Sequence, residues 1–150
     1  MEILICDDEP LALERLSRLV TQLGHQVSGK ATHGQQAIDL AQSLEPDVVL
    51  LDIQMPEMDG LTCASFLRQL DPMPAIIFCT AYDHHALDAF KSNAEGYLLK
   101  PVMQQELQQV LDHLIKLTQA QMSDIKQKEL MEELKINRHQ IAAKTYRGVE

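Results

Sequence analysis

Short apolar runs alternate along the chain with longer polar stretches. The runs that we predict to be strands are residues 3–6, 26–32, 48–52, 75–81 and 96–100. Four of them are continuous in apolar character, and only the second alternates. Continuous apolar strands are buried on both faces, as in a parallel sheet covered by helices.

The stretches between these runs have apolar residues at helical spacing. We predict helices over residues 11–23, 33–44, 61–70 and 83–93, and a last one from 104 to about 135. The first of them follows Pro10, a favoured first-turn residue, and stops at Gly24. Strand and helix thus alternate five times. This order predicts an α/β fold, a flavodoxin-like, doubly wound, five-stranded parallel sheet of order 2-1-3-4-5 with an extended C-terminal helix.

Polar residues stand at the ends of four of these strands. They are Asp7 and Asp8 after the first, Asp52 after the third, Thr80 at the end of the fourth and Lys100 at the end of the fifth. In such sheets ligands bind at the carboxyl ends of the strands. We therefore expect these side chains to meet at one edge.

Three carboxylates at one edge disfavour one another's ionisation unless a positive charge joins them. A hard divalent cation fits, and Mg²⁺ binds through one or two carboxylates while leaving room for phosphate oxygens. We predict Asp7, Asp8 and Asp52 as ligands, with the backbone carbonyl of Gln54 completing the shell. Asp52 stands alone at the middle strand and is the candidate nucleophile for phosphoryl transfer, with Thr80 and Lys100 beside it.

Four motifs, in order, resemble the response regulator receiver domain of two-component signalling. They are ILICDDEP, VVLLDIQMPEMDG, IIFCTAY and GYLLKP. Together they cover roughly residues 1–118. The resemblance implies that a sensor histidine kinase supplies a phosphoryl group. It also implies a protein that assists only its own phosphorylation and dephosphorylation and is not otherwise an enzyme.

The resemblance also implies a role for each matching residue. Asp52 matches the phosphoacceptor, Asp7 and Asp8 the acidic pair, Thr80 the hydroxyl switch, Lys100 the paired lysine, Tyr97 the switch aromatic, and Gln54 and Tyr82 the positions that tune phosphoryl lifetime. The bond between Lys100 and Pro101 matches a peptide that is usually cis. Phosphorylation would change the surface of helix 4, strand 5 and helix 5, and we expect a homodimer through it.

A narrower resemblance concerns residues 80–101, TAYDHHALDAFKSNAEGYLLKP, which look like regulators of the LytTR class, of the alginate-regulator type. We therefore expect a receiver domain over residues 1–118 and a helical linker over 119–138. Residues 139–150 would begin a truncated LytTR-type DNA-binding domain. DNA would be bound only through that C-terminal domain, most of which is missing.

Composition and charge limit the other functions that the chain could have. The formal net charge is −9, which argues against direct binding of nucleic acid by the acidic first part. No apolar run approaches the length of a membrane span, and we expect no membrane partner. Cys6, Cys63 and Cys79 lack metal-ligand or disulfide spacing. We expect a cytoplasmic protein in which Cys6 and Cys79, which lie inside apolar runs, are buried thiols.

Three other functions stay open on the residues alone. A phosphohydrolase of the haloacid dehalogenase type also uses a strand-end aspartate, but a second aspartate two residues later is replaced here by Gln54. A flavodoxin-like carrier would need a phosphate loop where Asp7 and Asp8 would repel a phosphate. A phosphorylation-independent interaction module is the third. The last helix fits a solvated linker better than a coiled coil, because Thr118 and Gln121 interrupt its apolar stripe.

Overall fold

The computed structural model describes residues 1–81 and 94–143. The chain divides into two compact units, Met1–Val110 and Leu111–Glu150, and each is described by itself. The predicted helix over residues 83–93 and Tyr82 lie outside the described residues. Among those described, no helix is both long and apolar enough to cross a bilayer.

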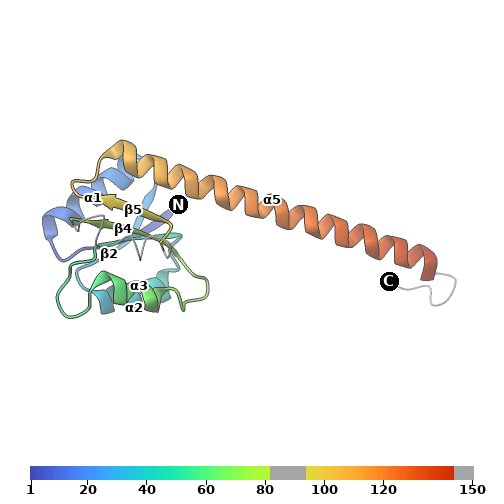
Figure 1. Cartoon of the computed structure of the whole chain (residues 1–150), viewed down its shortest axis with the longest axis horizontal. Coiled ribbons are helices and arrows are strands. Elements are labelled where there is room, and N and C mark those ends of the chain that lie inside the picture. Colours follow the sequence, from blue (N-terminus) through green and yellow to red (C-terminus); the bar gives the residue numbers. More distant parts are fainter. Residues whose placement is uncertain (82–93, 144–150) are drawn as a thin grey trace. The chain divides into compact units, whose positions relative to one another are not determined.

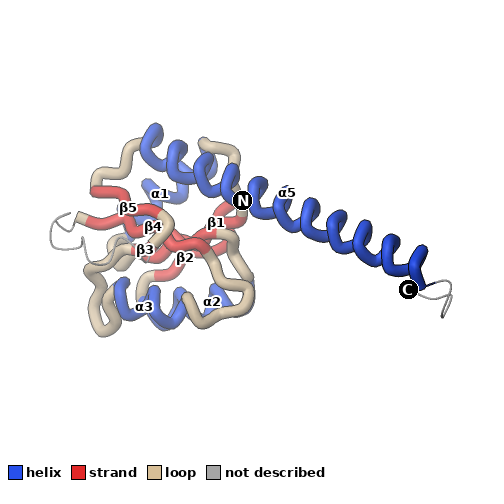
Figure 2. The backbone as a smooth tube through the Cα atoms, turned by 45° about the vertical axis from the view of Figure 1, so that its right-hand side comes forward, coloured by secondary structure: helices blue, strands red, loops and turns tan. Residues whose placement is uncertain are grey.

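The first unit is built on a five-stranded sheet of order β2-β1-β3-β4-β5, which confirms the predicted order (Figures 1 and 2). All four strand pairs are parallel. The strands are β1 (Glu2–Cys6), β2 (Gln26–Ala31), β3 (Val48–Leu51), β4 (Ala75–Thr80) and β5 (Gly96–Leu99). Each lies within one or two residues of its predicted range.

The helices cover both faces of this sheet. They are α1 (Pro10–Gln22), α2 (Gly34–Leu44), α3 (Gly60–Leu67) and the first residues of α5 (Gln104–Ala143), of which 104–110 belong to this unit. Figure 1 shows α2 and α3 on one side of the sheet and α1 on the other. Because both faces are covered, the residues of β1, β3 and β4 are almost all buried, as the continuous apolar runs predicted.

Alternate residues of the strands enter separate apolar layers. Those facing α2 and α3 form one cluster with the helix residues, including Leu4, Cys6, Val49, Leu51, Ile76, Phe78, Ala37, Ile38, Cys63 and Leu67. Residues between them, such as Ile5 and Cys79, are also fully buried but lie outside this cluster. This packing holds the carboxyl ends of β1, β3 and β4 side by side.

Two details of the fold differ from the pattern. The pairing of β1 with β2 shifts between Ile3 and Leu4, so that Ser28 is an extra residue of a β-bulge. Helix α3 ends at Leu67, three residues before the predicted end, and residues 68–72 form turns and bends.

The described part of the second unit is the continuation of α5 to Ala143. The helix passes its predicted end near residue 135, since no glycine or proline occurs before Gly148. Residues 139–143, expected to begin the DNA-binding domain, are helical here, and 144–150 lie outside the described residues. Several of its apolar side chains are exposed, among them Leu117, Met122 and Ile125. The domain boundaries and the choice between linker and coiled coil stay predictions.

Candidate phosphoacceptor and metal site

The site lies at the carboxyl ends of the paired strands. The backbone N–H of Asp52 donates to the carbonyl of Cys6 at 3.0 Å, one residue beyond β3. The N–H of Lys100 likewise donates to the carbonyl of Thr80 at 2.9 Å. These bonds extend the parallel pairing past the strands. They hold the predicted site residues at one edge of the sheet.

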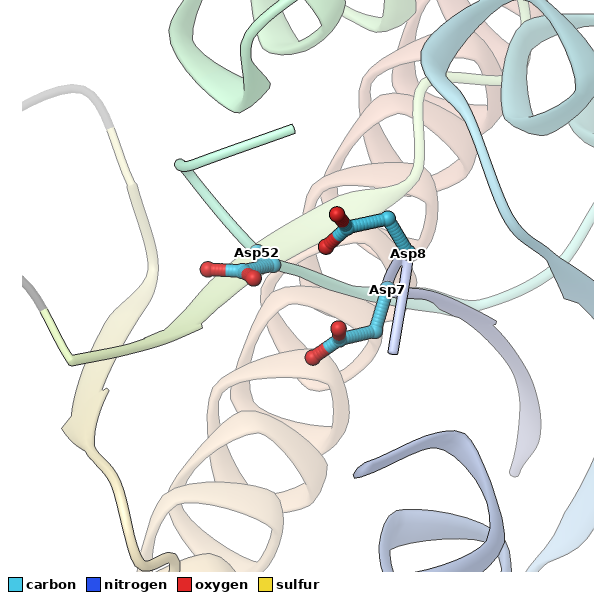
Figure 3. Close-up of side chains that lie close together, drawn as sticks. All are labelled: Asp7, Asp8 and Asp52. Atoms are coloured by element: carbon cyan, nitrogen blue, oxygen red, sulfur yellow. The ribbon is translucent and has the colours of Figure 1, made fainter. Parts of the chain in front are cut away.

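Three carboxylates meet at this edge (Figure 3). One oxygen each of Asp7, Asp8 and Asp52 lies within 4.8 Å of the other two. Asp7 is fully buried and Asp52 is 5 % exposed. Aspartates are rarely so buried without partners, and an all-oxygen cluster of this size is the donor set that hard divalent cations prefer. The residues present therefore fit a bound metal ion.

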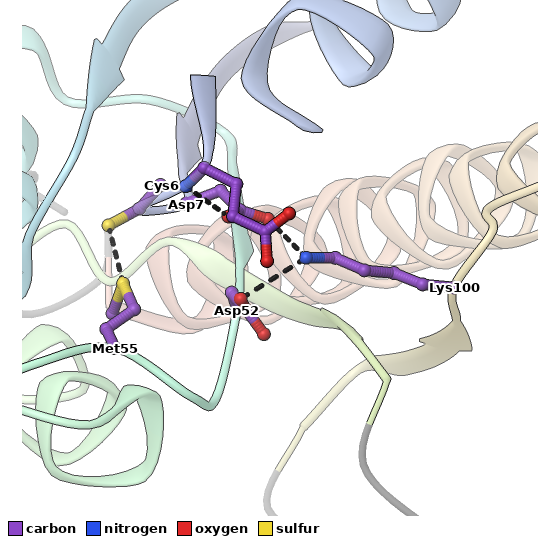
Figure 4. Close-up of polar contacts among 6 residues, drawn as sticks. Cys6, Asp7, Asp52, Met55 and Lys100 are labelled. Atoms are coloured by element: carbon purple, nitrogen blue, oxygen red, sulfur yellow. Dashed lines mark hydrogen bonds and ion pairs between the residues drawn. The ribbon is translucent and has the colours of Figure 1, made fainter. Parts of the chain in front are cut away.

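Lys100 supplies the positive charge in this pocket (Figure 4). Its Nζ lies 2.6 Å from Oδ2 of Asp7 and 3.3 Å from Oδ2 of Asp52. The second oxygen of Asp7 accepts the backbone N–H of Glu9 at 2.9 Å. The ammonium thus bridges the ends of β1 and β3 from the end of β5.

The charges of the pocket act on one another. Burial raises the pKa of Asp52, and the neighbouring charge of Asp7 raises it further, while Lys100 and Thr80 oppose the rise. Burial alone would lower the pKa of Lys100, but its hydrogen bond to Asp7 and the charge of Asp52 raise it on balance. The pocket therefore keeps a charged lysine and favours any further cation that lowers the repulsion between the carboxylates.

Thr80 and Tyr97, the predicted switch residues, lie on the neighbouring strands β4 and β5. Thr80 is fully buried at the end of β4. Tyr97 on β5 pairs in register with Phe78 and packs, partly buried, against the cluster under α2 and α3. Since Phe78 and Thr80 share a face of β4, the aromatic ring and the hydroxyl lie on the same side of the sheet.

The structure says less about the remaining predicted site residues. The side chain of Gln54 is exposed in the loop after Asp52, and its backbone carbonyl stays a predicted ligand. The bond between Lys100 and Pro101 is cis, which the resemblance implied. Tyr82, predicted to tune the phosphoryl lifetime, lies outside the described residues.

Sequence reasoning missed the backbone support of the acceptor. A Cβ on Gly60 would overlap the carbonyl oxygen of Asp52 and come within 2.7 Å of the Cα of Ile53. The N–H of Gly60 donates to the carbonyl of Ile53 at 2.7 Å. The pair Asp59-Gly60 before a helix was a visible signal, but only the closed loop shows that the glycine touches the acceptor.

Comparison with known proteins agrees with this geometry. Residues 3–112 match the model of the response regulator receiver domain. The chain is 53 % identical over 113 residues to the positive alginate biosynthesis regulatory protein of Pseudomonas aeruginosa, covering 74 % of this chain and 46 % of that protein. It is 40 % identical over 113 residues to the sensory transduction protein LytT of Enterococcus faecalis, covering 75 % and 47 %.

A solved structure shows the same architecture. The crystal structure of the complex of CheX, CheY, BeF3 and Mg²⁺ from Borrelia burgdorferi matches with a TM-score of 0.70 and 26 % identity. The match covers 77 % of this chain and 89 % of that one. This chain spans about half the length of the curated relatives it matches. Family model, relatives and fold agree, and the chain belongs to the response regulator receiver domains of two-component systems.

Proposed function

We propose that Asp52 accepts a phosphoryl group from a phosphohistidine of a sensor kinase, in the cytoplasm and with Mg²⁺ at Asp7, Asp8 and Asp52. The observation that carries the proposal is the meeting of three carboxylates with Lys100 at the carboxyl edge of the sheet. The Borrelia burgdorferi complex, which has the same fold and contains Mg²⁺ and the phosphoryl mimic BeF3, supports the proposal.

In the transfer, an Asp52 oxygen forms a bond to phosphorus while the N–P bond of the donor breaks. The freed imidazole then takes a proton from solvent. Mg²⁺ supplies charge neutralisation and orientation of the phosphoryl oxygens. Lys100 is placed to bond one of these oxygens, because its Nζ is already 3.3 Å from Asp52. The chain's share of the reaction is positioning and charge stabilisation, so we do not class it as an enzyme with a separate substrate.

An open hollow beside the pocket leaves room for a donor. It has a volume of about 370 Å³ and shares Lys100 and Pro101 with the site. Leu11 on its rim is 85 % exposed. The hollow is open enough for part of a protein donor to lie in it, and a small phosphorylated compound would also fit.

Phosphorylation would act on the protein through charge. It raises the negative charge at Asp52 to roughly −2 and adds strong acceptor oxygens for Thr80 and Lys100. A hydroxyl of Thr80 drawn toward them leaves space on the face that Tyr97 shares. A switch from 1:99 to 99:1 needs about 5.5 kcal/mol, which a few charge-assisted bonds can supply. We propose that the surface of helix 4, β5 and α5 then changes and promotes a homodimer, which controls transcription through a DNA-binding domain of the longer protein.

Acetyl phosphate labelling tests the acceptor. The wild type is expected to take up the phosphoryl group with Mg²⁺ and to take up none when a chelator is present from the start, whereas Asp52→Asn takes up none under either condition. Asp39→Asn, an exposed carboxylate on α2, is the matched control and should label like the wild type. Equal labelling of wild type and Asp52→Asn would refute the proposal.

Sedimentation with and without beryllofluoride tests the dimer separately. The mimic is expected to raise the mass of the wild type toward twice its value, and to leave Asp52→Asn unchanged. An unchanged mass of a wild type that does bind the mimic would refute the dimer and leave the phosphoacceptor assignment standing.

A further inference from the structure

A sulfur contact joins the two segments that carry the carboxylates of the pocket (Figure 4). The thiol of Cys6 donates to the thioether sulfur of Met55, with 3.5 Å between the sulfur atoms. Cys6 directly precedes Asp7, and Met55 directly follows Gln54. The contact therefore lies one residue from the acidic pair on one side and one residue from the predicted carbonyl ligand on the other.

Met55 anchors the loop that follows Asp52. Ile53 and Met55 are buried, whereas Gln54, Pro56 and Glu57 between and after them are exposed. The described backbone bonds of this loop run from Met58 to Pro56 and from Gly60 to Ile53, within the loop and the start of α3. The backbone pairing of this segment with β1 ends at the bond from Asp52 to Cys6. Beyond it, the Met55 side chain contacts β1 through Cys6.

Cys6 itself is fixed by its surroundings and can therefore fix the position of Met55. Its side chain is fully buried, and its Sγ also lies 3.6 Å from the carbonyl oxygen of His33, just before α2. Cys63 contacts the next carbonyl, that of Gly34, in the same way.

We infer that Cys6 is a positioning residue of the pocket: through Met55 it sets how far the loop bearing the Gln54 carbonyl lies from Asp7 and Asp8, and thereby the affinity for Mg²⁺. The inference rests on the proposed function. Mg²⁺ demands nearly ideal octahedral geometry with ligands at about 2.0–2.1 Å, so small loop displacements matter. A methionine side chain is flexible and follows a gap left by a missing neighbour.

Cys6→Ala tests this inference against a matched control. Cys79→Ala deletes the same thiol at an equally buried site, on the other face of the sheet and outside the Cys6 cluster. We expect Cys6→Ala to raise the Mg²⁺ Kd about tenfold, the lower end for residues that support metal ligands. Cys79→Ala should change it less than about twofold, a factor too small to reflect a displaced ligand. The Kd is followed by amide chemical shifts in a Mg²⁺ titration. Equal Kd values for the two variants would overturn the inference.

A double-mutant cycle separates positioning from general loss of stability. Met55→Ala alone is expected to weaken Mg²⁺ binding to a similar extent, and it also serves if Cys6→Ala does not fold. The double variant should be no weaker than either single variant by more than about twofold, since both break one contact. Additive losses would show independent packing effects and would overturn the inference.

The same titration distinguishes the inference from the function beneath it. A wild type that binds no Mg²⁺ and takes no phosphoryl group overturns both. A wild type that binds Mg²⁺ and labels at Asp52, beside a Cys6→Ala variant of unchanged Kd, overturns only the role of Cys6. Amide hydrogen exchange measured without metal is an independent test. The exchange rate at Gly60 should rise in Cys6→Ala and stay unchanged in Cys79→Ala.

Discussion

The negative charge of buried Asp52 is only partly balanced by its surroundings. Its carboxylate is 5 % exposed, next to the buried Asp7, and shares a single ammonium with it. Burial first and Asp7 second raise its pKa. The ionised acceptor therefore costs stability in the metal-free protein, and this cost is what a bound cation relieves.

Asp52→Asn should stabilise the metal-free protein, by about 1 kcal/mol or more at neutral pH, the usual scale for a poorly balanced buried group. The folded pKa is raised, so the cost is absent below the unfolded pKa of about 3.9, where both states are protonated. It grows as pH rises through the raised folded pKa. Urea unfolding with chelator between about pH 4 and 8 should show the gain increasing with pH. A gain that shrinks with pH would contradict this account of the pocket.

Gly60 shows how closely the backbone packs against the acceptor. Gly60→Ala places a Cβ against backbone atoms of Asp52 and Ile53, which no side-chain rotation relieves. We expect a loss of about 3 kcal/mol in unfolding free energy, the upper range for overpacking, together with weaker Mg²⁺ binding. Gly24→Ala is the control. Its φ of 87° makes the change a local strain of about 1 kcal/mol, with open space around the new Cβ and unchanged Mg²⁺ binding.

At the scale of elements, the strands were predictable because both faces of the sheet are covered. Burial on two faces leaves a continuous apolar run, and its end marks the edge where function lies. The positions of Asp7, Asp52, Thr80 and Lys100 followed from this alone. The β-bulge at Ser28 did not, because register depends on the partner strand. The contact of Cys6 with Met55 also escaped, since a cysteine in an apolar run reads only as core.

The start of α3 depends on a side-chain cap. Oδ1 of Asp59 accepts the backbone N–H of Thr62 at 2.8 Å. Asp59→Ala is expected to lower the unfolding free energy by about 1 kcal/mol, whereas Asp59→Asn, which keeps the acceptor oxygen, should lose little. Thermal unfolding of both variants checks this. Equal losses would mean that the charge at the helix start, rather than the hydrogen bond, stabilises the cap.

For the whole molecule, metal binding and folding are linked. The carboxylates predicted to bind Mg²⁺ come from the ends of two strands, Asp7 and Asp8 from β1 and Asp52 from β3, so the unfolded chain holds no equivalent site. A ligand that binds only the folded state stabilises it by about 2.7 kcal/mol at one hundred times its Kd. Unfolding of the wild type should shift upward with Mg²⁺, and that of Asp52→Asn should shift much less. An equal shift in both would place the metal elsewhere.

The pairing of Lys100 with Asp7 has a consequence for synthesis of the chain. The two residues are 93 positions apart, and β3 and β4 lie between β1 and β5 in the sheet. A nascent chain synthesised only as far as Asp52 contains all three carboxylates of the pocket but lacks Lys100. Under the proposed function, such a chain would lack the positive charge that pairs with Asp7 and Asp52, and we expect it to accept a phosphoryl group less readily than the complete domain.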